Sequence, residues 1–173
     1  MSSRWIPFGR IARAHGVHGA LRICSYGGEP RLLEPGRRVR LWHRQQAPWV
    51  SRIVLVRAVH AAVLVQLEGL TAREQAKPWA GGRLELDADE LPREQGTFFL
   101  FELHGASLHA PDGRRLGTVR RVVENAGQDL LVVGTESGEA LMPLVPETFV
   151  AFNRQAHALT IDPIPGLLDA PEE

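Results

Sequence analysis

Apolar and polar residues alternate over short stretches along most of this chain, which is the pattern of β-strands with one buried and one solvated face. Turn-forming residues such as Gly, Pro, Asn and Asp separate these stretches. In the first half, the pattern predicts two strands within residues 9–23 and further strands over residues 38–42, 49–60, 62–67 and 83–87. This number of short strands suits a small β-barrel, which the last of them would close.

The run from Gly9 to Ile23 predicts a hairpin whose turn is bracketed by glycines. Leu21 and Ile23 should face the core, with Arg22 and Cys24 on the opposite side. Glycine reaches positive φ without strain, so we expect a tight, rigid loop with a basic rim. The candidate binding residues of this hairpin are Arg10, Arg13, His15, Gly16, His18, Gly19 and Arg22.

A short helix is predicted just before the closing strand, because Thr71-Ala-Arg-Glu74 matches a capping box. Thr71 would cap the helix, and the Glu74 side chain would reach back to the amide of the cap. Pro78 lacks an amide hydrogen and clashes with the preceding turn, so it should end the helix. Leu32 and Leu33 fit a further single helical turn.

A polar segment over residues 89–97 is the best candidate for a linker. We therefore expect a first domain over residues 1–88 and a second over residues 98–173. The second half again predicts strands, which cover residues 106–110, 116–123, 130–133, 140–143 and 158–162. The fold class is thus all-β, with two small domains and one or two short helices.

Three stretches of the second half have other patterns. Phe98-Phe-Leu-Phe101 predicts a strand that is apolar on both faces. Residues 146–152 predict one or two helical turns, with Pro146 near the first helical position. The tail from Pro163 onward holds three prolines and is expected to be extended.

Composition favours a packed protein, because 44% of the 173 residues are apolar. No apolar run approaches membrane-spanning length and the N-terminus lacks a signal-peptide pattern, so we expect a soluble, cytoplasmic protein without a membrane contact. Cys24 is the only cysteine. It can form no internal disulfide and no cysteine-based zinc site, and we expect it to be buried and inert.

The net charge of zero conceals an asymmetry between the two halves. Residues 1–95 carry 15 basic and nine acidic residues, a net charge of +6, whereas residues 96–173 carry five and 11, a net charge of −6. Nearly all basic residues are arginine, which contacts phosphate in a planar, bidentate manner. A basic half of this kind indicates a nucleic-acid or ribonucleoprotein surface. A GC-rich genome explains the preference for Arg over Lys but not the difference in sign.

Catalytic motifs are missing from the sequence. It contains no glycine-rich phosphate loop, no dinucleotide-binding Gly-x-Gly-x-x-Gly after a strand and no Gly-x-Ser-x-Gly elbow. His15 and His18 have no third ligand at a recognisable spacing, so two polar histidines on a surface turn are the favoured interpretation. We therefore expect no catalytic residue, no metal and no cofactor.

Aromatic side chains leave two interpretations open. Phe98, Phe99 and Phe101 are either all core residues, or part of a strand covered by the other domain or by a protein partner. Trp42 lies on the side of its strand opposite Val39, where it is either exposed as an interface anchor or part of a small outer cluster with Trp49.

Motifs along the whole chain resemble those of the bacterial RimM family. The opening run Gly9-Arg-Ile-x4-His-Gly-Val-x-Gly-Ala-Leu-Arg-Ile resembles the signature with which that family begins. Leu70-Thr-Ala-Arg-Glu-Gln-Ala and Gly81-Gly-Arg-Leu-Glu-Leu are similar to its helix and closing strand. The second domain of the family is resembled in order by Phe98-Phe-Leu-Phe-Glu-Leu-His-Gly, Asp112-Gly-Arg-Arg-Leu-Gly-Thr-Val, Gly127-Gln-Asp-Leu-Leu-Val-Val, Met142-Pro-Leu-Val-Pro and Asp162-Pro-Ile-Pro-Gly-Leu-Leu-Asp.

This resemblance implies a fold and a role. It implies an N-terminal six-stranded barrel similar to a domain of translation factors, followed by a C-terminal PRC-type barrel. The implied role is non-catalytic assembly of the small (30S) ribosomal subunit at the head, formed by the 3′ domain of 16S rRNA, through binding of ribosomal protein S19, by a chain expected to be monomeric. The family usually has a Tyr-Tyr pair, associated with subunit binding, where this chain has Phe98 and Phe99. An alternative from the basic half alone is a general RNA-binding barrel.

Overall fold

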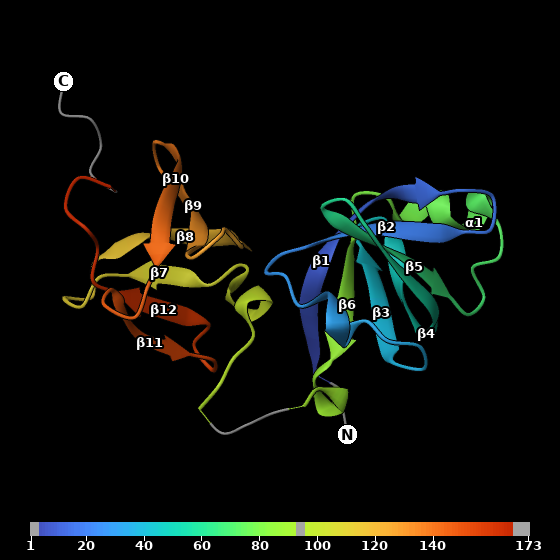
Figure 1. Cartoon of the computed structure of the whole chain (residues 1–173), viewed down its shortest axis with the longest axis horizontal. Coiled ribbons are helices and arrows are strands. Elements are labelled where there is room, and N and C mark those ends of the chain that lie inside the picture. Colours follow the sequence, from blue (N-terminus) through green and yellow to red (C-terminus); the bar gives the residue numbers. More distant parts are fainter. Residues whose placement is uncertain (1–3, 93–95, 168–173) are drawn as a thin grey trace. The chain divides into compact units, whose positions relative to one another are not determined.

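The computed structural model describes residues 4–92 and 96–167. The chain divides into two compact units, Met1–Phe98 and Phe99–Glu173, each with its own sheet and core (Figure 1). The domain bounds expected from the sequence, residues 1–88 and 98–173, stay a prediction. Part of the expected linker, residues 93–95, lies outside the described residues.

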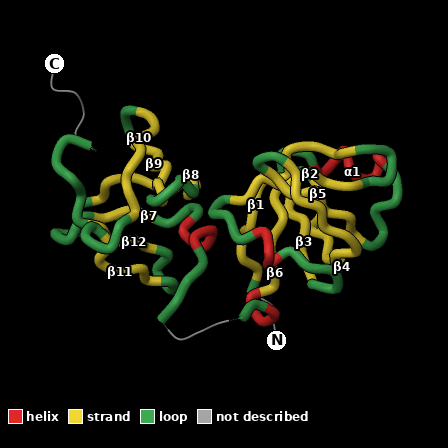
Figure 2. Tube along the Cα trace, viewed as in Figure 1, coloured by secondary structure: helices red, strands yellow, loops and turns green. Residues whose placement is uncertain are grey.

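Six antiparallel strands close the first unit into a barrel, in the order β1-β2-β5-β4-β3-β6 (Figures 1 and 2). Strand β1 completes the ring because it pairs with β2 on one side and with β6 on the other, where Trp5 lies opposite Asp87. The predicted N-terminal barrel is confirmed. Its strands are β1 (Trp5–His15), β2 (Ala20–Ser25), β3 (Arg38–His43), β4 (Gln46–Val59), β5 (Ala62–Leu67) and β6 (Arg83–Asp87).

Alternation of side chains explains how this barrel is packed. Val39 and Leu41 of β3 are fully buried inside it, whereas Arg38 and Arg40, which alternate with them, lie on the outer face. Strand β2 follows the same rule, since Leu21 and Ile23 are fully buried and Arg22 and Cys24 are half-buried. Cys24 is therefore less buried than expected, because it belongs to the outward-facing set. A 3-10 helix over Pro30–Leu32 confirms the predicted helical turn.

The short helix α1 spans Arg73–Ala76 and continues as a 3-10 helix over Lys77–Trp79, which contains Pro78. The predicted capping pair was wrong by one residue. The helix begins after Ala72, so the side chain that reaches back is that of Gln75, whose Oε1 accepts from the amides of Thr71 at 2.9 Å and Ala72 at 3.1 Å. Glu74 instead points away and accepts from Lys77 Nζ at 2.8 Å.

The second unit contains a six-stranded sheet in the order β10-β9-β8-β7-β12-β11. All of its pairs are antiparallel except β12 with β7, which are parallel. Buried apolar residues such as Leu108, Val119 and Leu131 form its core. The all-β class is confirmed for both units. The strands are β7 (Ser107–His109), β8 (Arg115–Val123), β9 (Asp129–Thr135), β10 (Gly138–Leu144), β11 (Phe149–Asn153) and β12 (Ala158–Ile161).

Three local predictions for the second half were wrong: the strand at residues 98–101, the helical turns at residues 146–152 and the extended tail. The stretch from Phe98 to Phe101 is not a strand: Phe98 and Phe99 precede a 3-10 helix over Leu100–Leu103. The Phe99 amide donates to the Glu102 carboxylate at 3.1 Å, which favours a helix start over strand pairing.

The stretch at residues 146–152 forms one turn and then strand β11. Thr148 and Phe149 donate their amides to the Val145 carbonyl, and pairing with β12 then extends the chain. In the tail, Gly166 has a positive φ of 84° and Leu167 donates to the Ile164 carbonyl, so residues 164–167 turn instead of staying extended. Residues 168–173 of that tail lie outside the described residues.

Candidate functional site

The predicted hairpin loop lies where β1 ends and β2 begins, at residues 16–19. Val17 is 69% exposed, and His15, Gly16 and His18 are also exposed. Gly16 and Gly19 have φ of +66° and +78°, in the left-handed region that a glycine enters freely. The glycine-bracketed turn is therefore present and presents its side chains to solvent.

The loop is held by residues of β5 and α1 and by the backbone between them. The Arg73 amide donates to the Val17 carbonyl at 3.1 Å, and Gln66 Nε2 donates to the His18 carbonyl at 2.7 Å. A Cβ atom on Gly19 would lie 2.9 Å from the Leu70 carbonyl oxygen, so only glycine fits this close approach. These contacts make the loop a supported platform. Sequence reasoning missed Gln66 and Arg73, because nothing in the local pattern links residues so far apart.

The predicted arginines of the hairpin lie in two separate places, some near the loop and one further along β1. Arg13 and Arg22 lie directly opposite each other on β1 and β2, close to the loop. Arg22 Nη2 donates to the His60 carbonyl at 2.9 Å, which directs this guanidinium toward the turn between β4 and β5. Arg10 lies five residues from His15, roughly 16 Å along the strand, and pairs across β6 with Arg83. The predicted hairpin residues thus form a loop group near Arg13 and a separate position at Arg10.

Tyr26 lies beside that separate position. Burial raises the pKa of its hydroxyl above the ordinary value of 10.0, while the positive charges of Arg83 and Arg10 act in the opposite direction. Tyr26 follows β2 directly and its amide donates to the Phe8 carbonyl at 2.9 Å. The outer side of β1 therefore carries a cluster of arginines next to an aromatic ring.

The second predicted group consists of Phe98 and Phe99, at the division between the units. Phe101 is fully buried, so this third phenylalanine is a core residue. The Phe99 ring stacks on Phe101 with centroids 5.3 Å apart and an interplanar angle of 6°. Phe98 and Phe99 are half-buried. The stretch therefore combines a core anchor with two partly accessible rings.

Glu102 holds this aromatic segment in place, and no local sequence pattern predicts that role. Its buried carboxylate accepts from Arg154 Nε at 2.7 Å and Nη2 at 3.2 Å, as well as from the Phe99 amide. His157 Nε2 lies 2.9 Å from the Glu102 carbonyl oxygen. Arg154, which lies 52 residues further along the chain, thus holds the start of the second unit in place through Glu102.

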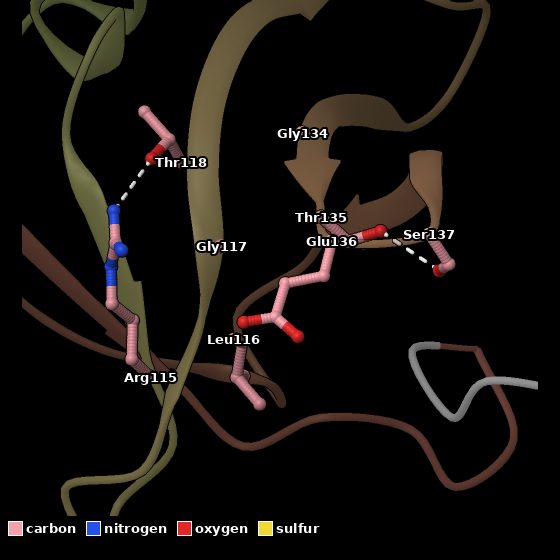
Figure 3. Close-up of a pocket in the computed structure, with 8 residues that line it drawn as sticks. All are labelled: Arg115, Leu116, Gly117, Thr118, Gly134, Thr135, Glu136 and Ser137. Atoms are coloured by element: carbon pink, nitrogen blue, oxygen red, sulfur yellow. Dashed lines mark hydrogen bonds between the residues drawn. The ribbon is translucent and has the colours of Figure 1, made fainter.

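A pocket in the second unit lies between β8, β9 and the turn that follows β9 (Figure 3). Arg115 Nη2 donates to Thr118 Oγ1 at 3.0 Å on one side, and the hydroxyls of Thr135 and Ser137 lie 3.2 Å apart on the other. Its charged groups are one guanidinium and the Glu136 carboxylate, a pairing that suits polar contacts. The lining residues are Arg115, Leu116, Gly117, Thr118, Gly134, Thr135, Glu136 and Ser137.

Fold and surfaces define a class: a protein of two small all-β units whose candidate surfaces consist of arginines, histidines and partly exposed aromatic rings. Among the described residues, no three or more His, Cys, Asp or Glu side chains gather in a way that could hold a metal ion. None of the described helices has the length and apolar character needed to cross a bilayer.

The chain belongs to the RimM family. Residues 6–91 match the RimM N-terminal domain and residues 100–167 match the RimM PRC barrel domain. Similar proteins include the ribosome maturation factor RimM of Synechococcus elongatus, 34% identical with 98% of this chain and 96% of the relative covered, and that of Trichlorobacter lovleyi, 30% identical with 97% of each chain covered. A crystal structure of a RimM protein from Pseudomonas aeruginosa is 22% identical and aligns with a TM-score of 0.46, covering 92% of this chain and 97% of that one.

Proposed function

We propose that this chain is a non-catalytic assembly factor for the small ribosomal subunit, which acts in the cytoplasm as a monomer. It aids maturation of the 3′, or head, domain of 16S rRNA and binds ribosomal protein S19. The observation that carries this proposal is the match of both halves to RimM domains in family order, together with relatives named ribosome maturation factors that are covered almost completely.

The opposite charges of the two halves support separate partners. A first half of net charge +6 suits RNA, whose backbone phosphates attract arginine. A second half of net charge −6 suits a basic ribosomal protein, because complementary charge accelerates and orients docking. In this proposal the hairpin loop contacts rRNA or S19, while Phe98 and Phe99 contribute apolar surface to the S19 contact.

The mechanism is binding to one conformation. A factor that holds an immature head in a productive arrangement, and loses affinity once the mature surface forms, shifts the population toward correct assembly. The rigid support of the hairpin loop by Gln66 and Arg73 fits this role, since a preformed surface loses less entropy on docking.

Sucrose-gradient sedimentation of a cell lysate tests the proposal directly. We expect the chain to migrate with immature small subunits and to be absent from mature ones. Even distribution over all ribosomal fractions, or none in any of them, would contradict an assembly role.

A pull-down with S19 tests the aromatic contact. The double variant Phe98→Ala with Phe99→Ala should retain less S19 while its circular dichroism spectrum stays folded. Leu141→Ala with Val150→Ala is the matched control, because these side chains are 56% and 52% exposed elsewhere on the second unit. Unfolding of the phenylalanine variant would identify both rings as core residues instead.

A general RNA-binding barrel is the second candidate, favoured by the arginines on the first unit. It predicts similar affinity for arbitrary RNA, a steep salt dependence and no association with subunit precursors. Migration with immature subunits in the gradient would exclude it as the whole function.

A further inference from the structure

The outer face of strands β1, β6 and β3 carries arginines and tryptophans in register. Across this face Arg40 lies opposite Glu85, and Trp42 lies opposite Arg83. One row further along, Trp5 lies opposite Asp87. The hairpin loop does not include these residues, so this is a separate surface, which we name the arginine face.

The buried Glu85 carboxylate links two arginines of the arginine face, Arg40 and Arg83. Its side chain is only 1% exposed, and it accepts from Arg40 Nε at 2.5 Å and from Arg83 Nε at 2.7 Å. A buried carboxylate normally requires such compensation, and here two guanidinium groups share one acid. Both arginines are therefore held at their Nε atoms.

Tryptophan rings fix the same two arginines from a second direction. The Arg83 guanidinium lies 4.0 Å from the centroid of Trp42, and that of Arg40 lies 5.1 Å from the centroid of Trp5. A planar guanidinium stacks favourably on an aromatic face. Rotation of each group is restricted by the carboxylate and by the ring together.

The terminal nitrogens of these two arginines remain available. Among the described residues, the hydrogen bonds of Arg40 and Arg83 use Nε alone, and the side chains keep 26% and 32% of their surface exposed. Each guanidinium therefore offers its Nη donors to solvent from a fixed position. Two oriented guanidinium groups match the bidentate geometry that phosphate oxygens accept.

We propose that the arginine face binds the phosphodiester backbone of an RNA strand, with a phosphate seated between Arg40 and Arg83. Exposed Arg10 pairs across the sheet with Arg83, and Arg52 lies opposite Arg38 on the neighbouring strand β4, so positive charge continues on both sides. Phosphate is favoured over the carboxylates of an acidic protein because the aromatic-backed guanidinium groups also offer stacking surface to bases. The inference deepens the proposed function by assigning its RNA contact to this face.

The test is fluorescence anisotropy with a labelled single-stranded RNA of about 12 nucleotides, a length within the usual range for one barrel domain. Arg40→Gln with Arg83→Gln should weaken binding at least about tenfold and reduce the salt dependence by about one unit of slope per lost phosphate contact. Arg44→Gln with Arg57→Gln is the matched control. It removes the same charge from exposed positions of the same barrel, outside the arginine face, and should cost less than about threefold because salt screens distant charges.

A second variant separates geometry from charge and from folding. Arg40→Lys with Arg83→Lys keeps both charges beside Glu85 but lacks the extra Nη donors, so it should also weaken binding about tenfold. Far-UV circular dichroism checks that the barrel is folded, because Trp5 and Trp42 contact the substituted arginines and their fluorescence would change without unfolding. If the glutamine pair unfolds, the lysine pair decides.

Three outcomes would overturn the proposal: no binding of the RNA by the unaltered protein at low salt, an equal loss in the control, or full affinity in the lysine pair. Tighter binding of a labelled polyglutamate peptide than of RNA would overturn it too, since an acidic protein would then be the partner. Normal RNA binding by a chain that fails to sediment with subunit precursors would refute the proposed function alone.

Discussion

The close approach of Gly19 to the backbone of residues 70–72 allows a quantitative test of how the hairpin loop is held. In Gly19→Ala, the added Cβ would meet the Leu70 carbonyl oxygen at 2.9 Å and the Ala72 amide nitrogen and carbonyl oxygen at 3.0 Å. None of these is the end of a flexible side chain, so the backbone itself has to move. The residue also has φ of +78°, which alanine adopts only with strain.

Gly16 supplies the control, because it has a φ of +66° but no atom within 4 Å of an added Cβ. A left-handed conformation costs alanine about 1–2 kcal/mol, which both variants should lose. Crowding in a packed site adds about 1–3 kcal/mol, which only Gly19→Ala should lose. We therefore expect Gly19→Ala to lower the free energy of unfolding by about 2–5 kcal/mol and Gly16→Ala by about 1–2 kcal/mol.

Urea unfolding followed by tryptophan fluorescence measures this difference in the first unit alone, since Trp5, Trp42, Trp49 and Trp79 all belong to it. With a slope of about 1–3 kcal/mol per M, the midpoint of Gly19→Ala should lie roughly 1 M below that of Gly16→Ala. Equal midpoints would refute the reasoning, because the loop would then be free to move away from residues 70–72.

Two further predictions concern a partly buried tyrosine and a buried carboxylate. Burial raises the pKa of Tyr26, so its neutral form is favoured in the folded state; the stability it contributes should be complete below pH 10.0 and fall as the pH rises through the folded pKa. Absorbance titration of this single tyrosine should show a midpoint above 10.0, and Tyr26→Phe should remove this part of the pH dependence of unfolding. Glu102→Gln should destabilise the second unit by about 1–2 kcal/mol in urea unfolding followed by circular dichroism, a reduced value because Arg154 is partly exposed and solvent screens the pair. The exposed Glu136→Gln is its control, and equal loss in both would contradict a specific role for Glu102.

Strands were predictable wherever one face is buried and the other is solvated. The run at residues 38–42 lies within β3, because Val39 and Leu41 enter the barrel while Arg38 and Arg40 alternate with them on the outer face. Predictions failed where a contact distant in sequence decides the conformation. The Phe98 stretch has the composition of a strand, but the Phe99 amide donates to the Glu102 carboxylate, which Arg154 holds from 52 residues away. Residues 146–152 look helical locally, but pairing with β12 extends Phe149–Asn153 into strand β11.

The candidate sites divide in the same way. The turn glycines of the hairpin were predictable, because positive φ has a local residue signature. The support of that loop by Gln66 was not, since it depends on how β5 is placed beside the turn. The arginine face is a further case: Arg40 and Glu85 are 45 residues apart, and only the register of β3 against β6 brings them together.

The first strand of each unit pairs with a strand that is synthesised much later, β1 with β6 and β7 with β12. Trp5 of β1 can pair with Asp87 of β6 only after residue 87 has been synthesised, and Ser107 of β7 can pair with Ala158 of β12 only after residue 158 has been synthesised. During synthesis, β1 therefore emerges with one edge unpaired until β6 has followed it, which exposes strand edges to wrong partners and slows folding. A protein with this strand order is expected to fold slowly as it is synthesised. Truncation at either end of a unit removes a strand with which a strand at the other end has to pair.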